Sequence, residues 1–194
     1  IVLSGLHTQS RDFPAARRVL ERQLQQDADN VDVLLQLGRV DIAENRLGDA
    51  RLRFRRALLI APENTQAAME MAQLAALEGD TARSVSWLET ARDSGEDALL
   101  PRIRLATQYL SLNRTEEAMR VAEEAVLINE RDARARNLLG VAQMAIGDFN
   151  SAADNFAEAV QLEPAVPAYH YNDARAELHK GNRRVALRII RANH

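Results

Sequence analysis

Four histidines are the residues of this 194-residue chain best suited to metal binding or acid–base catalysis. His170 and His179 are nine residues apart in one predicted helix, so they point to opposite sides and cannot share a metal ion. Glu177 and His179 are two residues apart and also diverge. His7 and His194 have no such partner in sequence, and no H-E-x-x-H, phosphate-binding glycine loop or G-x-S-x-G motif occurs. We therefore predict no catalytic residue, no metal site and no cofactor, and we expect that the chain is not an enzyme.

The densest group of charged side chains is basic and comprises Arg51, Arg53, Arg55 and Arg56, with Arg17, Arg18 and Arg22 one repeat earlier. We interpret it as a solvated surface whose arginines pair with nearby Asp and Glu. The formal net charge of -3 argues against a nucleic-acid or anionic lipid partner. No apolar run is long enough to span a membrane. The absence of cysteine excludes disulfides, thiol catalysis and zinc sites of the Cys type.

A fixed 34-residue period organises the chain. Small residues recur at Ala16, Ala50, Ser84, Ala118, Ala152 and Ala186, and a second small column is Ser4, Gly38, Ala72, Ala106, Gly140 and Ala174. The two columns are twelve residues apart, which lets them face each other across two antiparallel helices. Large apolar residues form two further columns, Leu3, Leu37, Met71, Leu105 and Leu139, and Leu20, Phe54, Leu88, Phe156 and Ile190. Such a period predicts a solenoid of helical hairpins.

Turn residues recur at the same period. Gly or Asn occupies five of the six positions Arg11, Asn45, Gly79, Asn113, Gly147 and Gly181, where a helix is expected to end in the left-handed conformation. Expected helix N-caps are Asp12, Asp80, Asp148 and Asn182 within hairpins and Asn30, Asn64 and Asp132 between them. Asp173 stands in the first large apolar column, so we expect a helix shift or a partner such as a nearby Arg.

These columns resemble the tetratricopeptide repeat, most closely at Leu37-Gly38, Ala50, Phe54, Ala57 and Pro62 and again at Leu139-Gly140, Gly147-Asp148-Phe149, Ala152, Phe156, Ala159 and Pro164. The resemblance covers the whole chain and implies an all-α, right-handed superhelical solenoid of antiparallel hairpins. We predict a single array over 1–194, with full repeats at 31–64, 65–98, 99–132 and 133–166 and partial repeats at 1–30 and 167–194. We expect the array to be a fragment of a longer one, and its ends to associate with each other.

The resemblance also implies where a partner binds, because the first helices of such hairpins line a concave groove for a peptide or partner helix. The matching positions here are Gln36, Arg39, Met69, Glu70, Gln73, Arg104, Thr107, Arg134, Asn137, Tyr171, Asn172 and Arg175, with Asp32, Gln66, Ile103 and Val141 on the same faces. Four arginines against Asp32 and Glu70 predict a locally positive groove that binds an acidic or C-terminal carboxylate, with Arg104 central. The alternative is that these faces are solvated and that the partner binds elsewhere in a longer array.

A second resemblance covers shorter segments. Trp87-Leu88-Glu89-Thr90-Ala91-Arg92, Ala98-Leu99-Leu100-Pro101-Arg102 and Leu139-Gly140-Val141-Ala142-Gln143 are similar to the bacterial tetratricopeptide lipoproteins of the PEP-CTERM and exosortase exopolysaccharide system. This resemblance implies a place in the bacterial periplasm or envelope, with the cytoplasm as the alternative. The function expected is a non-catalytic adaptor that binds a protein segment. The alternative is a self-associating scaffold without a dedicated peptide site.

Overall fold

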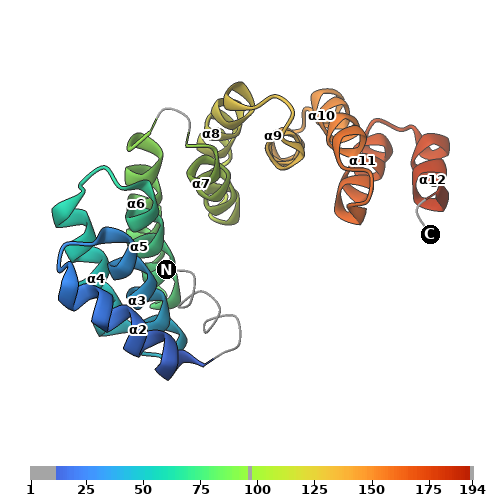
Figure 1. The fold of residues 1–194 in the computed structure, drawn as a ribbon. Helices are drawn as coiled ribbons and strands as arrows, with labels where there is room; N and C mark the ends of the chain where they lie inside the picture. Colours follow the sequence, from blue (N-terminus) through green and yellow to red (C-terminus); the bar gives the residue numbers. More distant parts are fainter. Residues whose placement is uncertain (1–11, 96–97, 193–194) are drawn as a thin grey trace. The chain divides into compact units, whose positions relative to one another are not determined.

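The computed structural model describes residues 12–95 and 98–192, and over these residues the chain contains helices and turns but no strand. The chain forms two compact units, residues 1–96 and 97–194 (Figure 1). In the first unit the helices are α2 (Phe13–Gln26), α3 (Val31–Ala43), α4 (Leu47–Ile60), α5 (Thr65–Leu77) and α6 (Thr81–Asp93). In the second unit they are α7 (Leu99–Ser111), α8 (Thr115–Ile128), α9 (Ala133–Ile146), α10 (Phe149–Leu162), α11 (Pro167–His179) and α12 (Arg183–Ala192).

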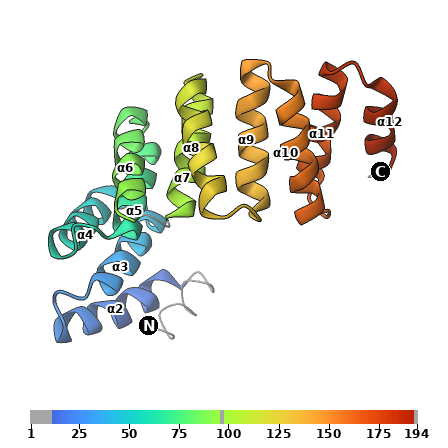
Figure 2. The ribbon, with the colours of Figure 1, turned by 90° about the horizontal axis from the view of Figure 1, so that it is seen from above.

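Each unit is a stack of antiparallel helical hairpins. The pairs α3–α4 and α5–α6 form hairpins in the first unit, and α7–α8, α9–α10 and α11–α12 do so in the second. Figure 2 shows α7 to α12 following one another in a row, each beside the next. First helices also contact each other, α3 with α5 and α9 with both α7 and α11. The all-α hairpin architecture predicted from the 34-residue period is confirmed.

The turn inside each hairpin has the same geometry. Left-handed φ angles occur at Asn45 (60°), Gly79 (76°), Asn113 (57°), Gly147 (87°) and Gly181 (87°). In each turn the N–H of the following residue donates to a carbonyl five residues earlier, as from Asp148 to Gln143 at 2.9 Å, which closes the first helix. The predicted turn column is therefore confirmed at these five positions, while Arg11 lies outside the described residues.

Side-chain caps fix most of the predicted helix starts. The side chains of Asp12, Asp80, Asp148, Asn30, Asn64 and Asp132 each accept a hydrogen bond from a backbone N–H in the first turn of the following helix. For Asn182 the structure gives a different contact, because its side-chain amide donates to Glu177 at 2.7 Å. Capping by local side chains explains why the helix starts follow the sequence period so closely.

The small and large columns form the core of each unit. The residues at Ala16, Ala50, Ser84, Ala118, Ala152 and Ala186 are all buried, whereas Ile190 at the end of its column is 38% exposed. The glycines, however, do not simply oppose these small residues. A Cβ on Gly38 would lie 2.2 Å from Phe54 Cε1, and one on Gly140 would lie 2.7 Å from Phe156 Cε1. The two glycines therefore let an aromatic ring of the second helix lie against the backbone of the first.

A buried network of charges joins α2, α3 and α4. Asp41 is fully buried, and its carboxylate lies 2.7 Å from Arg17 Nη2, 3.0 Å from Arg46 Nη2 and 2.7 Å from Arg53 Nε. Glu44 accepts from Arg17 at 2.8 Å. The interpretation of the basic cluster as solvated is thus wrong for Arg17 and Arg53, since a buried carboxylate needs such donors to offset its lost hydration. The sequence period does not show this network, because Ala, Tyr and Gln take the place of Asp41 in the next three repeats.

The remaining arginines of that cluster fit the interpretation better. Arg51 pairs with Glu78 on the next hairpin, and Arg56 lies 3.1 Å from Asp29. Arg55 is exposed. Pairs of this exposed kind contribute little to stability, so the outer part of the cluster acts mainly as a hydrated surface.

Asp173 is half-buried at its apolar position in the second unit. Burial raises the pKa of Asp173 to about 6, the negative charge of Glu177 adds to the rise, and His170 and Lys180 oppose it. The expected arginine partner is not found, since Asp173 has no hydrogen bond or ion pair to any described residue. The ionised carboxyl group at this apolar position therefore destabilises the folded chain at neutral pH.

Candidate functional site

In the first unit, the predicted groove residues form an ion pair between α3 and α5. Arg39 Nε and Nη2 each lie 2.7 Å from Glu70 Oε1, and Gln66 Nε2 donates to the same oxygen at 2.8 Å. Glu70 is 5% exposed, so its carboxylate depends on these donors. Met69 beside it is buried and Gln73 is exposed. Arg39 is balanced by Glu70 and offers no unpaired charge to an acidic ligand.

In the second unit, two of the predicted arginines differ in what they contact. Arg104 is exposed on α7 and forms no ion pair with a described carboxylate, and Thr107 one turn later donates to the Ile103 carbonyl at 2.7 Å. Arg134, at the start of α9, is held by Asp132 through bonds of 3.2 and 2.6 Å. The hydrogen bond from Arg134 holds the pKa of Asp132 below its usual value. Arg104 is thus available to a ligand, whereas the charge of Arg134 is balanced.

The first helices of the last two hairpins, α9 and α11, are joined by a hydrogen bond between two side-chain amides. Asn172 Nδ2 donates to Asn137 Oδ1 at 2.8 Å. Tyr171 is 62% exposed, and the guanidinium carbon of Arg175 lies 5.6 Å from the centre of its ring. Arg175 forms no ion pair with a described carboxylate. The positive charge predicted for the groove is therefore unbalanced at Arg104 and Arg175, both in the second unit.

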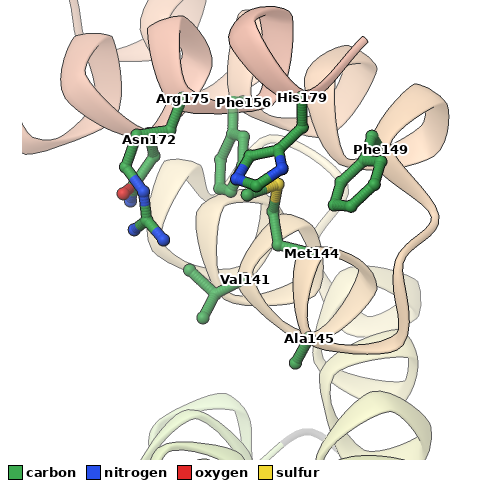
Figure 3. Close-up of a pocket in the computed structure, with 8 residues that line it drawn as sticks. All are labelled: Val141, Met144, Ala145, Phe149, Phe156, Asn172, Arg175 and His179. Carbon is green, nitrogen blue, oxygen red and sulfur yellow. The ribbon is translucent and has the colours of Figure 1, made fainter.

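A pocket of about 370 Å³ lies between α9, α10 and α11, where two of the predicted residues meet. It is lined by Val141, Met144, Ala145, Phe149, Phe156, Asn172, Arg175 and His179. Figure 3 shows Asn172 and Arg175 at one end and Phe149 at the other, with His179 and Met144 between them. Five of the lining residues are apolar, and none carries a carboxylate. The pocket thus has an apolar interior and a cationic end.

The local sequence explains the shape of this pocket. Because Gly140 has no side chain, the Phe156 ring lies against α9 and forms part of the pocket wall. His179 stacks on Phe149, with ring centres 4.6 Å apart and planes inclined by 18°. Arg175 and His179 are one helical turn apart on α11, about 6 Å along its axis, so both side chains reach the same pocket.

The equivalent place in the first unit is filled differently. Val141 and Asn172 correspond, three 34-residue periods earlier, to Arg39 and Glu70. The ion pair of Arg39 with Glu70 occupies in the first unit the positions at which the second unit has a small apolar side chain and a neutral amide. Gln36, one turn before Arg39, is half-buried. The same repeat positions therefore carry an ion pair in the first unit and an uncharged pair in the second.

Sequence reasoning found part of this site and missed the rest. Asn172 and Arg175 were predicted as partner-binding residues, and Val141 was placed on the same face, whereas Met144, Phe149 and His179 were not. Phe149 is the first residue of α10 and His179 is the last residue of α11, and only the fold brings their rings together. The residue type gave a signal for His179, since the four preceding repeats have aliphatic or small residues at its position, but gave none for Phe149, whose position also carries Phe13.

Two other features bear on the class of protein. Within residues 12–95 and 98–192, no group of three or more His, Asp or Glu side chains is placed to bind a metal ion. None of the described helices is both long enough and apolar enough to cross a membrane.

The fold and the repeated turns define a class of helical repeat proteins, and the sequence comparisons agree. Tetratricopeptide repeat family models match residues 7–74 and residues 138–187. The chain belongs to the tetratricopeptide repeat proteins. No curated protein matches the chain.

Solved structures of tetratricopeptide repeat proteins share the fold. YrrB, described as a TPR protein with an unusual peptide-binding site, is 19% identical, with a TM-score of 0.71 over 88% of each chain. MamA from Desulfovibrio magneticus RS-1 is 18% identical, with a TM-score of 0.73 over 84% of this chain and 92% of that one. PilW, described as a type IV pilus biogenesis factor, is 15% identical, with a TM-score of 0.75 over 96% of this chain and 87% of that one. These similarities concern the fold.

Proposed function

We propose that the chain is a non-catalytic adaptor that binds a peptide segment on the first helices of its second unit. The observation that carries this proposal is the pocket between α9 and α11, because it opens among the positions where a tetratricopeptide groove is expected and includes Asn172 and Arg175. An apolar interior with a few polar groups is typical of a ligand site. The peptide-binding site described for YrrB, a protein of the same fold, supports the proposal.

A selection from a random peptide library displayed on phage tests this function. The wild-type chain should enrich peptides that a pocket-filling variant, Ala145→Trp, does not retain. Leu127→Trp is the matched control, because Leu127 is 78% exposed on α8 and lies outside the pocket lining. Enrichment by the wild type and by Leu127→Trp, but not by Ala145→Trp, is the expected result. Equal enrichment by all three proteins, or none by the wild type, contradicts a peptide site in this pocket.

Within this adaptor function we propose a place in bacterial envelope or exopolysaccharide-associated protein sorting. Its support is the sequence resemblance around Trp87 and Leu139. A pull-down from a bacterial envelope extract compares the wild type with Arg104→Glu/Arg175→Glu. This pair avoids Arg39, whose reversal would place a carboxylate against the buried Glu70. A double variant of two exposed arginines outside the pocket, Arg120→Glu/Arg131→Glu, controls for the change of net charge. An envelope protein lost only with the first variant supports the proposal, and identical profiles oppose it.

Self-association is the second candidate function, and α12 favours it. Val185, Leu187 and Ile190 are 39, 51 and 38% exposed on this helix. Apolar side chains in such exposed positions gain from being covered by another surface. Sedimentation over a range of concentrations tests for a scaffold, with Leu187→Gln/Ile190→Gln as the variant that should weaken assembly. A monomer at every concentration excludes this candidate.

A further inference from the structure

The pocket of the second unit has the form of a site for one apolar side chain with an acidic neighbour. Its floor and far end are formed by Met144, Phe156 and the stacked rings of Phe149 and His179. A volume of about 370 Å³ accommodates one large side chain and part of the backbone that carries it. The near end holds Arg175, whose guanidinium carbon lies 5.6 Å from the centre of the Tyr171 ring and which forms no ion pair with a described carboxylate.

The charges around the pocket favour a negatively charged residue next to the apolar residue of the ligand. None of the eight lining residues is Asp or Glu, so a carboxylate on the ligand would meet no like charge there. Arg175 can hold a carboxylate through two parallel hydrogen bonds. The side-chain nitrogen of Asn172 donates one of its two hydrogens to Asn137, which leaves the other as a donor for a ligand. In the first unit the positions of Val141 and Asn172 are held by Arg39 and Glu70, whose side chains pair with each other, so no such charge is left unpaired there.

The spacing of the two ends sets the spacing of the ligand groups. Arg175 and His179 are one helical turn apart, about 6 Å along α11. In an extended peptide, side chains two residues apart point to the same side and are separated by about 6.6 Å. An apolar residue and an acidic residue separated by one residue therefore match the apolar floor and Arg175 together.

We infer that this pocket binds an extended peptide segment in which a large apolar residue and a carboxylate are separated by one residue. The inference rests on the proposed peptide-binding function and adds to it the chemistry of the ligand. The carboxylate belongs either to an Asp or Glu side chain or to a C-terminus that follows the apolar residue by one position. These two sources share the same contact with Arg175.

Synthetic peptides test the inference by fluorescence polarisation. The probes are fluorescein-labelled, amidated dodecapeptides of Gly and Ser that carry Leu-Ser-Asp or the reverse order, Asp-Ser-Leu. Matched probes replace Asp by Asn or Leu by Ala, and one further probe ends in Leu-Ser with a free carboxylate. We expect either loss, of the carboxylate or of the apolar side chain, to weaken binding about tenfold. The probe with the free C-terminus distinguishes the two sources of the carboxylate.

Variants of the protein complete the test. Arg175→Met keeps most of the side-chain volume and removes the charge, so it should abolish the preference for Asp over Asn while leaving the preference for Leu over Ala. Arg131→Met, at an exposed arginine outside the pocket, should retain both preferences. Circular dichroism melts of both variants verify that each is folded at the temperature of the assay.

The results separate the inference from the function on which it rests. Peptides that bind with no preference for Leu or Asp overturn the inference and leave the adaptor function standing, as does an Asp preference that survives Arg175→Met. The absence of binding by any probe at about 1 mM overturns the inference. Phage selection with no enrichment by the wild type overturns the function as well.

Discussion

Replacing Gly140 by Ala perturbs the packing on which the pocket depends. The added methyl would lie 2.7, 2.8 and 3.0 Å from three atoms of the Phe156 ring, distances at which the ring must move. Phe156 is 1% exposed, is packed with Ala152, Ala153 and Ala176, and also lines the pocket. We expect the ring to move toward the pocket, into the space that a ligand side chain would fill.

The expected magnitude follows from two opposing effects. Ala is favoured over Gly inside a helix by about 1 kcal/mol, whereas forcing an extra methyl into a packed core costs about 1–3 kcal/mol. Since three ring atoms are affected, we expect Gly140→Ala to lower the free energy of unfolding by about 1 kcal/mol, and to weaken binding of the Leu-Ser-Asp peptide about tenfold, as partial loss of an apolar site would. Urea unfolding followed by circular dichroism and peptide polarisation measure the two effects.

The equivalent glycine, Gly38, and a helical glycine with free space around it, Gly48, provide the controls. Gly38→Ala introduces a closer contact, 2.2 Å to the Phe54 ring, so it should destabilise the first unit by about 2 kcal/mol without changing peptide affinity. A Cβ on Gly48 meets nothing within 4 Å, so Gly48→Ala should stabilise α4 by about 0.5 kcal/mol. The reasoning is refuted if Gly140→Ala stabilises the chain as Gly48→Ala does, or if Gly38→Ala and Gly140→Ala weaken peptide binding equally.

Three further changes test other parts of the structure. Asp173→Asn should remove a pH dependence, because the pKa of Asp173 is raised from 3.8 to about 6 and the unfolded chain therefore loses this proton first as pH rises. Such a shift corresponds to about 3 kcal/mol for a fully buried group, and less for a half-buried one. The wild type should therefore lose about 1–2 kcal/mol more unfolding free energy than the variant between pH 4 and 7 in urea titrations. Asp41→Ala should destabilise the chain by about 3 kcal/mol in the same assay, because it removes the buried carboxylate that three arginines share and leaves Glu44 alone to balance Arg17 and Arg46. An effect below about 1 kcal/mol would contradict the importance of the network. Gly147→Ala should lower the unfolding free energy by about 1 kcal/mol, because the φ of 87° at this position is unfavourable for a residue with a side chain. Gly147→Asn should cost less, since Asn adopts this conformation more readily, and equal effects of Ala and Asn in thermal melts would argue against a backbone cause.

The fold was predictable from the sequence because its determinants are local and repeated. Left-handed turn residues such as Gly147 and caps such as Asp148 act within a few residues of the helix ends that they define. Burial of the small column follows from the period alone, since each repeat packs on the next in the same way. These signals recur in every hairpin, so one irregular repeat, such as that with Ser84, does not change the prediction.

The site was only partly predictable because its decisive contacts join side chains of different repeats. The helix faces placed Arg39 and Arg175 on equivalent positions, but only the structure shows that Glu70 pairs with the first and that no described carboxylate pairs with the second. Stacking of His179 on Phe149 likewise depends on how the consecutive helices α10 and α11 pack, because the two residues lie at opposite ends of this helix pair in the sequence. Periodicity gives the face on which a side chain lies, whereas the partner it finds there depends on neighbouring residues that do not repeat.

Methionine-methyl NMR tests the central claim, that the pocket of the second unit binds a peptide, most directly. Of the four methionines, Met144 lines the pocket, whereas Met69, Met71 and Met119 lie outside it. In a titration of methyl-labelled protein with the Leu-Ser-Asp peptide, we predict that the Met144 resonance, assigned with Met144→Leu, shifts and saturates while the other three stay fixed. A Met144 resonance that does not move when another methionine shifts would contradict the claim.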